Sequence, residues 1–242
     1  RAAAEKEWKA AVEVGDLEKA HKAASRSSRL EGSMVDESKD LLDAMGVPWV
    51  AAPGEGEAQM AVMVNRGEVW AGASQDFDAM LFGAPTLVRN LTLAGKRRLS
   101  SGRVVDVTPE VVRLGDVLSA LSITREQLVD VGILVGTDFN DGVRGIGPKK
   151  GLALIRRLGD LEHVAAEGKI NVPEEYPEVR NIFLDPVSSS DYSISWRAPD
   201  HEGIRSIMFD RHSFSVDRID SVVSRLSHDA QGGSQASLDS WS

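Results

Sequence analysis

Short apolar runs alternate with amphipathic stretches and polar turns along most of the chain. Residues 37–45 carry apolar side chains at helical spacing, and the apolar run at 45–50 predicts a short strand leaving that helix. A second strand-like run covers 68–73, and a third apolar segment covers 131–136. These elements fit an open α/β sheet.

Local start signals and alternating segments predict further elements. An N-cap and a first-turn proline at 108–110 predict one helix, and a capping box at 124–127 predicts another. Between 89 and 107 we expect strand, turn and strand, with basic side chains around the turn. A basic tip that meets phosphate and an edge strand protected by charge both remain open. The basic residues are Lys96, Arg97 and Arg98.

The two ends of the chain differ in composition. Residues 2–24 are rich in helix formers with Lys and Glu at i, i+4 spacing, which predicts solvated helices. Residues 179–183 predict a helix, and 201–226 predict two more, with Phe209, Phe214 and Ile219 in the core. From 227 to 242 the glycine and serine content predicts a flexible tail.

Carboxylates follow each of the three apolar segments. If those segments end at one edge of a sheet, their acids meet in the crevice there. Crowded carboxylates repel one another unless a cation neutralises them, and Mg²⁺ or Mn²⁺ prefers oxygen ligands. Taken singly, each acid is better explained by a helix N-cap or a solvated loop than by a metal site. Together they predict a site for divalent metal. The acids are Glu55, Glu57, Asp76, Asp78 and Asp138.

A glycine- and lysine-rich stretch follows the last of these acids. Its sequence, Gly145-Ile146-Gly147-Pro148-Lys149-Lys150, supplies a tight turn, a proline suited to a first helical turn, and lysines beside exposed amides. Such groups hold phosphate without base preference, so the expected contact is with duplex shape. A plain helix start explains only the proline and one glycine. The candidate DNA contacts are Gly145, Gly147, Lys149 and Lys150.

Four ordered stretches, 45–58, 75–83, 133–140 and 142–150, carry a family resemblance. The chain resembles the flap endonuclease family of structure-specific 5′ nucleases, in its archaeal and eukaryotic form. The resemblance implies a PIN-like α/β nuclease core (37–226) that includes a helix-two-turn-helix DNA-binding element at about 125–160 and a helical C-terminal part. It also implies hydrolysis of flap or branched DNA in replication and repair, as 5′ flap endonuclease and 5′-3′ exonuclease.

The resemblance assigns the cofactors as well. The five acids correspond to members of a larger carboxylate cluster that holds two Mg²⁺ ions, with Mn²⁺ as a substitute. A monovalent cation would bridge backbone and phosphate at the helix-two-turn-helix element. Two such divalent ions about 4 Å apart activate a water and stabilise the leaving oxygen in phosphodiester cleavage.

The resemblance also has a departure. Family members carry a long segment before the position of Arg1, with the first strand and two further metal aspartates, so the chain resembles an N-terminally truncated member. Residues 1–36 then correspond to a remnant of the helical arch. Because metal ligands and neighbouring strands lie in that segment, we expect this chain alone to cleave flaps poorly or not at all.

The C-terminal tail carries a candidate binding peptide. Gln235, Leu238 and Trp241 stand at positions one, four and seven, as in the peptide by which clamp-associated enzymes dock on the DNA sliding clamp. Ser242 stands where a second aromatic residue is usual, so we expect weakened binding.

Composition limits the remaining possibilities. The 242 residues are 42% hydrophobic, enough for one core and a subdomain. No stretch approaches the roughly 20 apolar residues of a membrane span, so no membrane partner is expected. The absence of cysteine excludes disulfides and thiolate metal sites, which leaves oxygen ligands. The family expectation is a monomer, cytoplasmic and nucleoid-associated if archaeal, nuclear if eukaryotic.

The net charge of −9 is unusual for a protein that binds DNA through its backbone. Clustered acids that bind cations account for part of this charge. Nineteen of the 28 basic residues are arginine, a balance that fits adaptation to high salt, although ordinary acidic composition fits as well. The alternative function is a DNA- and clamp-binding module without catalysis; a PIN-like ribonuclease fits the acids but not the lysine stretch or the tail.

Overall fold

The computed structural model describes residues 32–92, 95–98 and 102–232, which belong to two compact units. The central unit is 51–192. The terminal unit combines the described parts of 1–50 and 193–242. Among the described residues, no helix combines the length and the apolar character that crossing a membrane requires.

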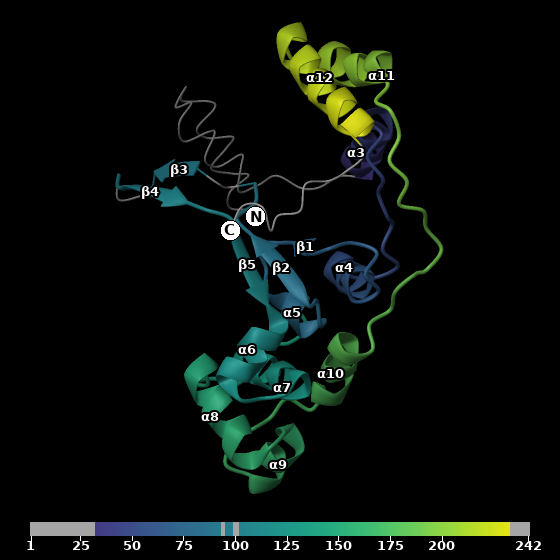
Figure 1. The fold of residues 1–242 in the computed structure, drawn as a ribbon. Coiled ribbons are helices and arrows are strands. Elements are labelled where there is room, and N and C mark those ends of the chain that lie inside the picture. Colours follow the sequence, from purple (N-terminus) through teal and green to yellow (C-terminus); the bar gives the residue numbers. More distant parts are fainter. Residues whose placement is uncertain (1–31, 93–94, 99–101, 233–242) are drawn as a thin grey trace, which may run out of the picture. The chain divides into compact units, whose positions relative to one another are not determined.

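The central unit is built on a small mixed sheet with strand order β1-β2-β5 (Figure 1). β1 (Gly72–Ala73) lies parallel to β2 (Thr86–Arg89), and β2 pairs antiparallel with β5 (Glu110–Arg113). Leu87 and Val88 of β2 are buried. A second, two-stranded antiparallel sheet is formed by β3 (Gly95–Arg98) and β4 (Val104–Val107).

Helices of the central unit pack on this sheet and on one another. α4 packs beside β1 at Gly72, where a Cβ would lie 2.4 Å from Met60 Sδ. Phe183 is fully buried, with its ring centroid 4.8 Å from that of Phe82 and 5.3 Å from that of Phe139. The helices are α4 (Gly56–Asn65), α5 (Asp78–Leu81), α6 (Leu114–Leu121), α7 (Arg125–Val135), α8 (Pro148–Leu158), α9 (Leu161–Glu167) and α10 (Tyr176–Leu184).

Two predictions for the segment between residues 89 and 121 are wrong in detail. The helix expected to start at 108–110 begins only at Leu114, because 110–113 pairs with β2 and this ladder overrides the local start signal. The hairpin itself is present, but Lys96, Arg97 and Arg98 lie within strand β3 and not around the turn. The capping box at Thr124 is confirmed, with the side chain of Gln127 completing it.

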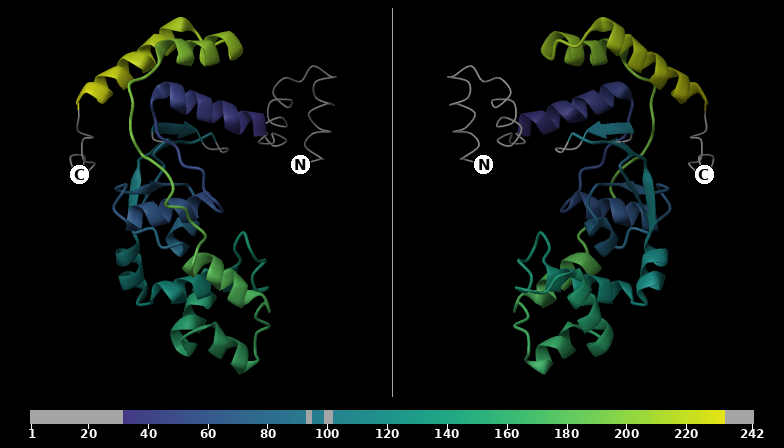
Figure 2. Two further views of the ribbon diagram at one scale, coloured as in Figure 1. Left: turned by 90° about the vertical axis from the view of Figure 1, so that its right-hand side faces the viewer. Right: turned by 90° about the vertical axis from the view of Figure 1, so that its left-hand side faces the viewer.

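The terminal unit is helical in its described part. α3 (Gly32–Met45) contains the predicted helix at 37–45, and α11 (His201–Arg205), η1 (Ser206–Arg211) and α12 (Val216–Gly232) follow in the C-terminal part (Figure 2). Ile204, Ile219 and Val223 form its buried cluster, against which Ala44 and Met45 pack.

Several expectations for this unit need correction. Residues 46–50 form no strand; Gly46 ends α3 with a φ of +72°, and its carbonyl accepts a hydrogen bond from Arg197 N at 3.0 Å. Phe209 and Phe214 are each 40% exposed and are not core residues, whereas Ile219 is. α12 continues to Gly232, past the expected start of the tail at 227. Residues 1–31 and 233–242, including Gln235, Leu238 and Trp241, lie outside the described residues.

A buried ionic cluster joins three helices of the central unit. Asp130 of α7 is fully buried, and its carboxylate accepts hydrogen bonds from Leu161 N at 3.3 Å and from Arg180 Nη2 at 3.4 Å. Arg180 Nε lies 3.1 Å from Asp130 Oδ1, though without good hydrogen-bond alignment, and its Nη1 donates to Glu162 at 2.9 Å. The cluster fixes α7, α9 and α10 together.

This cluster predicts a pH dependence of stability. Burial raises the pKa of Asp130 to about 6 from 3.8, and outweighs the attraction of Arg180 and the hydrogen bond from Leu161; Glu162 and Asp160 raise it further. The pKa of Asp130 is higher in the folded than in the unfolded protein. The contribution of the protonated Asp130 to stability is therefore fully present below about pH 4 and is lost as the pH rises through about 6. The loss is about 3 kcal/mol at about 1.4 kcal/mol per pKa unit.

The measurement is the free energy of unfolding from urea titrations between pH 4 and pH 7, for the wild type and for Asp130→Asn. The difference between the two curves isolates this group from the other titrating residues. We expect the wild type to lose stability relative to Asp130→Asn as the pH rises; parallel curves would contradict the assignment.

Candidate metal and nucleic-acid site

The first acid pair lies at the start of α4. Glu55 is the N-cap residue with an extended backbone, and its side chain makes no capping hydrogen bond. Glu57 lies in the first turn, and its carboxylate accepts a short hydrogen bond from the hydroxyl of Ser74, which follows β1. The link between Glu57 and Ser74 therefore joins the start of α4 to the end of β1.

The second pair spans the turn after β1 and the start of α5, whose first residue is Asp78. Asp76 N donates to Ser74 Oγ at 3.0 Å, and Asp78 N donates to Asp76 Oδ1 at 3.2 Å, so local hydrogen bonds set the turn. Arg89, at the end of β2, holds it from one side: its Nη2 donates to Gln75 O at 3.3 Å, and its guanidinium lies 4.1 Å from the ring centroid of Phe77. Arg89 thus contacts the residues on either side of Asp76 without pairing with the carboxylate of Asp76 or Asp78.

Asp138 lies in the turn that follows α7. Asn140 fixes this turn: its buried amide donates to Ile133 O at 2.8 Å, and its Oδ1 accepts from Thr137 Oγ1 at 2.8 Å. Phe139 N donates to Thr137 Oγ1 at 3.1 Å. The exposed side chain of Asp138 is therefore carried by a turn anchored to the C-terminal end of α7.

Two of the five acids, Glu57 and Asp78, have a raised pKa. Burial raises the pKa of Asp78 to about 6, and the charges of Asp76, Asp138, Glu57 and Glu55 raise it further. Burial also raises the pKa of Glu57, opposed by the hydrogen bond from Ser74 and reinforced by Asp76, Glu55 and Asp138. Three segments distant in sequence thus deliver their carboxylates to one region.

The donor set fits a hard divalent cation in chemistry. All five side chains offer oxygen, and none of them forms a salt bridge with a basic side chain among the described residues. Within 32–92, 95–98 and 102–232, however, no three His, Asp or Glu side chains come close enough together to hold one ion. The structure therefore shows a cluster of unpaired negative charge that a cation would stabilise, and not a finished coordination shell.

The glycine- and lysine-rich stretch lies between α7 and α8. Gly147 is the N-cap of α8 and Pro148 its first residue, as the sequence predicts, and Gly145 has a φ of +83°. Lys149 and Lys150 are both exposed, and Lys150 Nζ donates to Gly145 O at 3.1 Å. The amides at the start of α8, beside two lysines, have the chemistry to hold a phosphate.

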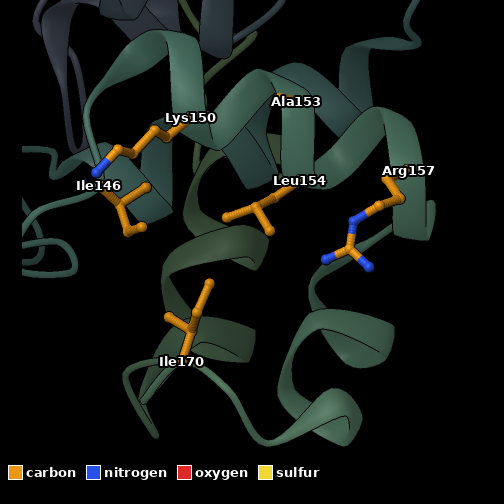
Figure 3. A pocket seen from close by; sticks show the side chains of 6 residues that line it. All are labelled: Ile146, Lys150, Ala153, Leu154, Arg157 and Ile170. Atoms are coloured by element: carbon orange, nitrogen blue, oxygen red, sulfur yellow. The ribbon is translucent and has the colours of Figure 1, made fainter.

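A hollow of about 380 Å³ lies along α8 (Figure 3). Ile146, Leu154 and Ile170 give it an apolar lining, and Lys150 and Arg157 stand at its margins. Arg157 is already paired with Glu167 through two hydrogen bonds of 2.9 and 2.8 Å. None of the five acids lines this hollow.

The sequence did not identify three residues that shape the site: Ser74, Arg89 and Asn140. Ser74 precedes Asp76 by two residues and Asn140 follows Asp138 by two. This closeness to a candidate acid is the only sequence signal that could have identified them. Arg89 contacts the Gln75–Phe77 turn from another strand, so no local pattern indicates its role.

The XPG I-region family model matches residues 46–138, which include all five acids. Flap endonuclease 1 of Aeropyrum pernix is 46% identical to the chain, over all of this chain and 71% of that relative. The solved structure of flap endonuclease-1 from Methanococcus jannaschii is 39% identical, with a TM-score of 0.74 over 91% of this chain and 65% of that one.

Human GEN1, solved in complex with Holliday junction DNA, is similar in fold. It is 25% identical, with a TM-score of 0.65 over 85% of this chain and 56% of that chain. The chain thus spans between 56% and 71% of the length of these three proteins. Its architecture is that of a PIN-like α/β nuclease.

Proposed function

Because the chain belongs to the flap endonuclease 1 family, we propose that it provides the acid-bearing and duplex-binding parts of a nuclease that cleaves 5′ flaps in branched DNA. The expected reactions are endonucleolytic flap removal and 5′-3′ exonucleolytic trimming during replication and repair. The observation that carries the proposal is that three separate segments bring five carboxylates to one region, where the hydroxyl of Ser74 joins two of the segments and the charges of the other acids raise the pKa of Glu57 and Asp78.

Divalent metal ions are general in this family. In this chain Glu55, Glu57, Asp76, Asp78 and Asp138 would hold two ions, Mg²⁺ or in its place Mn²⁺. When bound, such ions supply Lewis-acid stabilisation of phosphoryl oxygens and a metal-activated water.

The protein's own residues arrange this site. Ser74 orients the Glu57 carboxylate, Arg89 supports the turn that carries Asp76 and Asp78, and Asn140 supports the turn that carries Asp138. Positioning and charge are therefore the contributions of the protein, and they are the main sources of rate in phosphoryl chemistry.

The duplex next to the cleavage site would be held at the start of α8. Gly145 and Gly147 allow the backbone to approach a phosphate, and Lys149 and Lys150 add positive charge. The carbonyl of Gly145 already accepts a hydrogen bond from the Lys150 ammonium, so it is directed at cationic groups. Backbone carbonyls of this element, such as that of Gly145, would hold a monovalent cation, which would add positive charge beside a bound phosphate.

Lys149→Ala is expected to weaken binding to flap and to plain duplex DNA alike, because a phosphate contact carries no sequence information. The slope of log affinity against log salt should fall by about 1. The measurement is fluorescence anisotropy at several salt concentrations. Lys169→Ala is the matched control, because Lys169 is an exposed lysine that pairs with Glu167 outside this element. An equal effect of both substitutions would count against a phosphate contact at Lys149.

The remaining assignments follow from the family resemblance. Gln235, Leu238 and Trp241 would dock on the DNA sliding clamp, with Ser242 weakening the contact. The protein would act as a monomer, in the nucleoid-containing cytoplasm of an archaeon or the nucleus of a eukaryote. Binding of a synthetic 233–242 peptide to a clamp, compared with its Leu238→Ala form, tests the first of these.

The test of the function is Mg²⁺-dependent cleavage of a labelled double-flap DNA. It compares this chain alone with the chain joined to the part of the Aeropyrum pernix relative that it does not match. We expect junction-specific cleavage by the joined protein and poor or no cleavage by the chain alone. Efficient cleavage by the chain alone would contradict the second expectation.

A second candidate is a DNA- and clamp-binding module without catalysis. It is favoured by one observation: no three acids lie close enough to hold an ion within the part of the chain that the structure describes. If the joined protein is folded by circular dichroism and binds flap DNA but does not cut it, this second function replaces the first.

A further inference from the structure

The segment that follows α10 lies along α4 without forming a helix or a strand. This segment, residues 185–192, is called the strap (Figures 1 and 2). It contacts residues 54–68 at three places, and later residues of the strap contact later residues of 54–68, so the two segments run in the same direction. A Cβ on Gly54 would lie 3.8 Å from Val187 O, and the Tyr192 hydroxyl donates a hydrogen bond to Glu68.

The middle contact is made by Gln59, whose side chain is buried with 3% of its surface exposed. Its Nε2 donates to Ser189 O at 3.1 Å, and its Oε1 accepts from Ser189 N at 2.8 Å. One side-chain amide thus satisfies both backbone groups of one strap residue, as a neighbouring strand would. Because both partners lie in a part-buried position, losing this pairing would leave polar groups without partners.

Gln59 is also tied directly to the first turn that carries two of the acids. Its backbone N–H donates to Glu55 O at 3.1 Å, the first bond of α4, and Glu57 lies two residues before it. Ser74 restrains Glu57 from the β1 side, whereas Gln59 restrains the same turn from the strap side. The turn is therefore held from two directions.

We propose that Gln59 is a positioning residue for the metal site. Its pairing with Ser189 fixes the first turn of α4, and with it Glu55 and Glu57, relative to the other three acids. This inference rests on the proposed function, because it assumes that the five acids bind divalent metal. Neither Gln59 nor Ser189 offers a group directed at the metal, so both act through α4.

The test is Mn²⁺ binding to the DNA-free protein, followed by electron paramagnetic resonance of the free ion, together with the thermal unfolding midpoint. Gln59→Leu removes both hydrogen bonds with little change in size. Ser189→Pro removes the N–H donor from the other side of the same contact. Ser189→Ala keeps both backbone groups that pair with Gln59 and loses only the exposed hydrogen bond from Asp191 N to Ser189 Oγ, so it is the matched control.

We expect Gln59→Leu to raise the Mn²⁺ dissociation constant about ten-fold, in line with the effect of losing a residue that orients a metal ligand. Ser189→Pro should shift it in the same direction, the double variant should add little to the larger single effect, and Ser189→Ala should match the wild type. A folded Gln59→Leu or Ser189→Pro protein with wild-type Mn²⁺ affinity would overturn the inference, whatever its unfolding temperature.

The two levels of the proposal fail differently. If the wild type shows no Mn²⁺ binding that depends on Asp76 and Asp138, the proposed function and this inference both fall. If that binding is present in the wild type and unchanged in the strap variants, only the role of Gln59 is overturned.

Discussion

Gly142→Ala is expected to lower the free energy of unfolding of the central unit by about 3 kcal/mol or more. Gly142 has a φ of +71°, and a Cβ there would lie 2.5 Å from Val135 O and from Gly136 N. These are backbone atoms at the end of α7, so no side chain can move aside. The overlap would push the turn that carries Asp138 away from α7.

Gly145→Ala is the matched control for this prediction. Gly145 has a similar φ of +83°, but no atom lies within 4 Å of a Cβ placed there. Its substitution should therefore show the conformational penalty of a positive φ alone, about 1 kcal/mol. Chemical denaturation of both variants measures the difference; equal losses would contradict the close backbone approach at Gly142.

Asp138→Asn is expected to reduce flap cleavage by the joined protein at least about a hundred-fold, because it removes one charged ligand while preserving size and turn geometry. Single-turnover cleavage with excess enzyme measures the effect. Asp141→Asn is the control: Asp141 is an exposed aspartate three residues further along, and it is not among the charges that raise the pKa of Asp78. A similar loss in both variants would show a general charge effect and contradict a specific role for Asp138.

The sequence predicted the helices whose signals are local. The capping box at Thr124 and the proline at position 148 both mark helix starts in the structure. The sequence-based prediction failed where pairing with a distant strand determines the secondary structure. Residues 110–113 pair with β2 as a strand despite the Thr-Pro helix-start signal before them. Residues 46–50 are apolar enough for a strand, but an apolar run specifies no partner.

The candidate site shows the same division. The acids stand out because each follows an apolar segment, and the structure brings them within electrostatic influence of one another. The contacts that hold the elements in place are less visible, since Gln59 and its partner Ser189 beside the first turn of α4 are 130 positions apart, and the Asp130–Arg180 pair that joins α7 to α10 spans 50. Such contacts depend on the fold and leave no local pattern.

The most direct test of the central claim, that the five acids form one divalent-metal site, is Mn²⁺ titration of the wild type against Asp76→Asn/Asp138→Asn. Asp106→Asn/Asp141→Asn, which removes the same charge from positions outside the cluster, is the control. The account predicts Mn²⁺ binding by the wild type and the control that is lost or weakened at least about ten-fold in Asp76→Asn/Asp138→Asn. Equal Mn²⁺ affinity in all three proteins would contradict it.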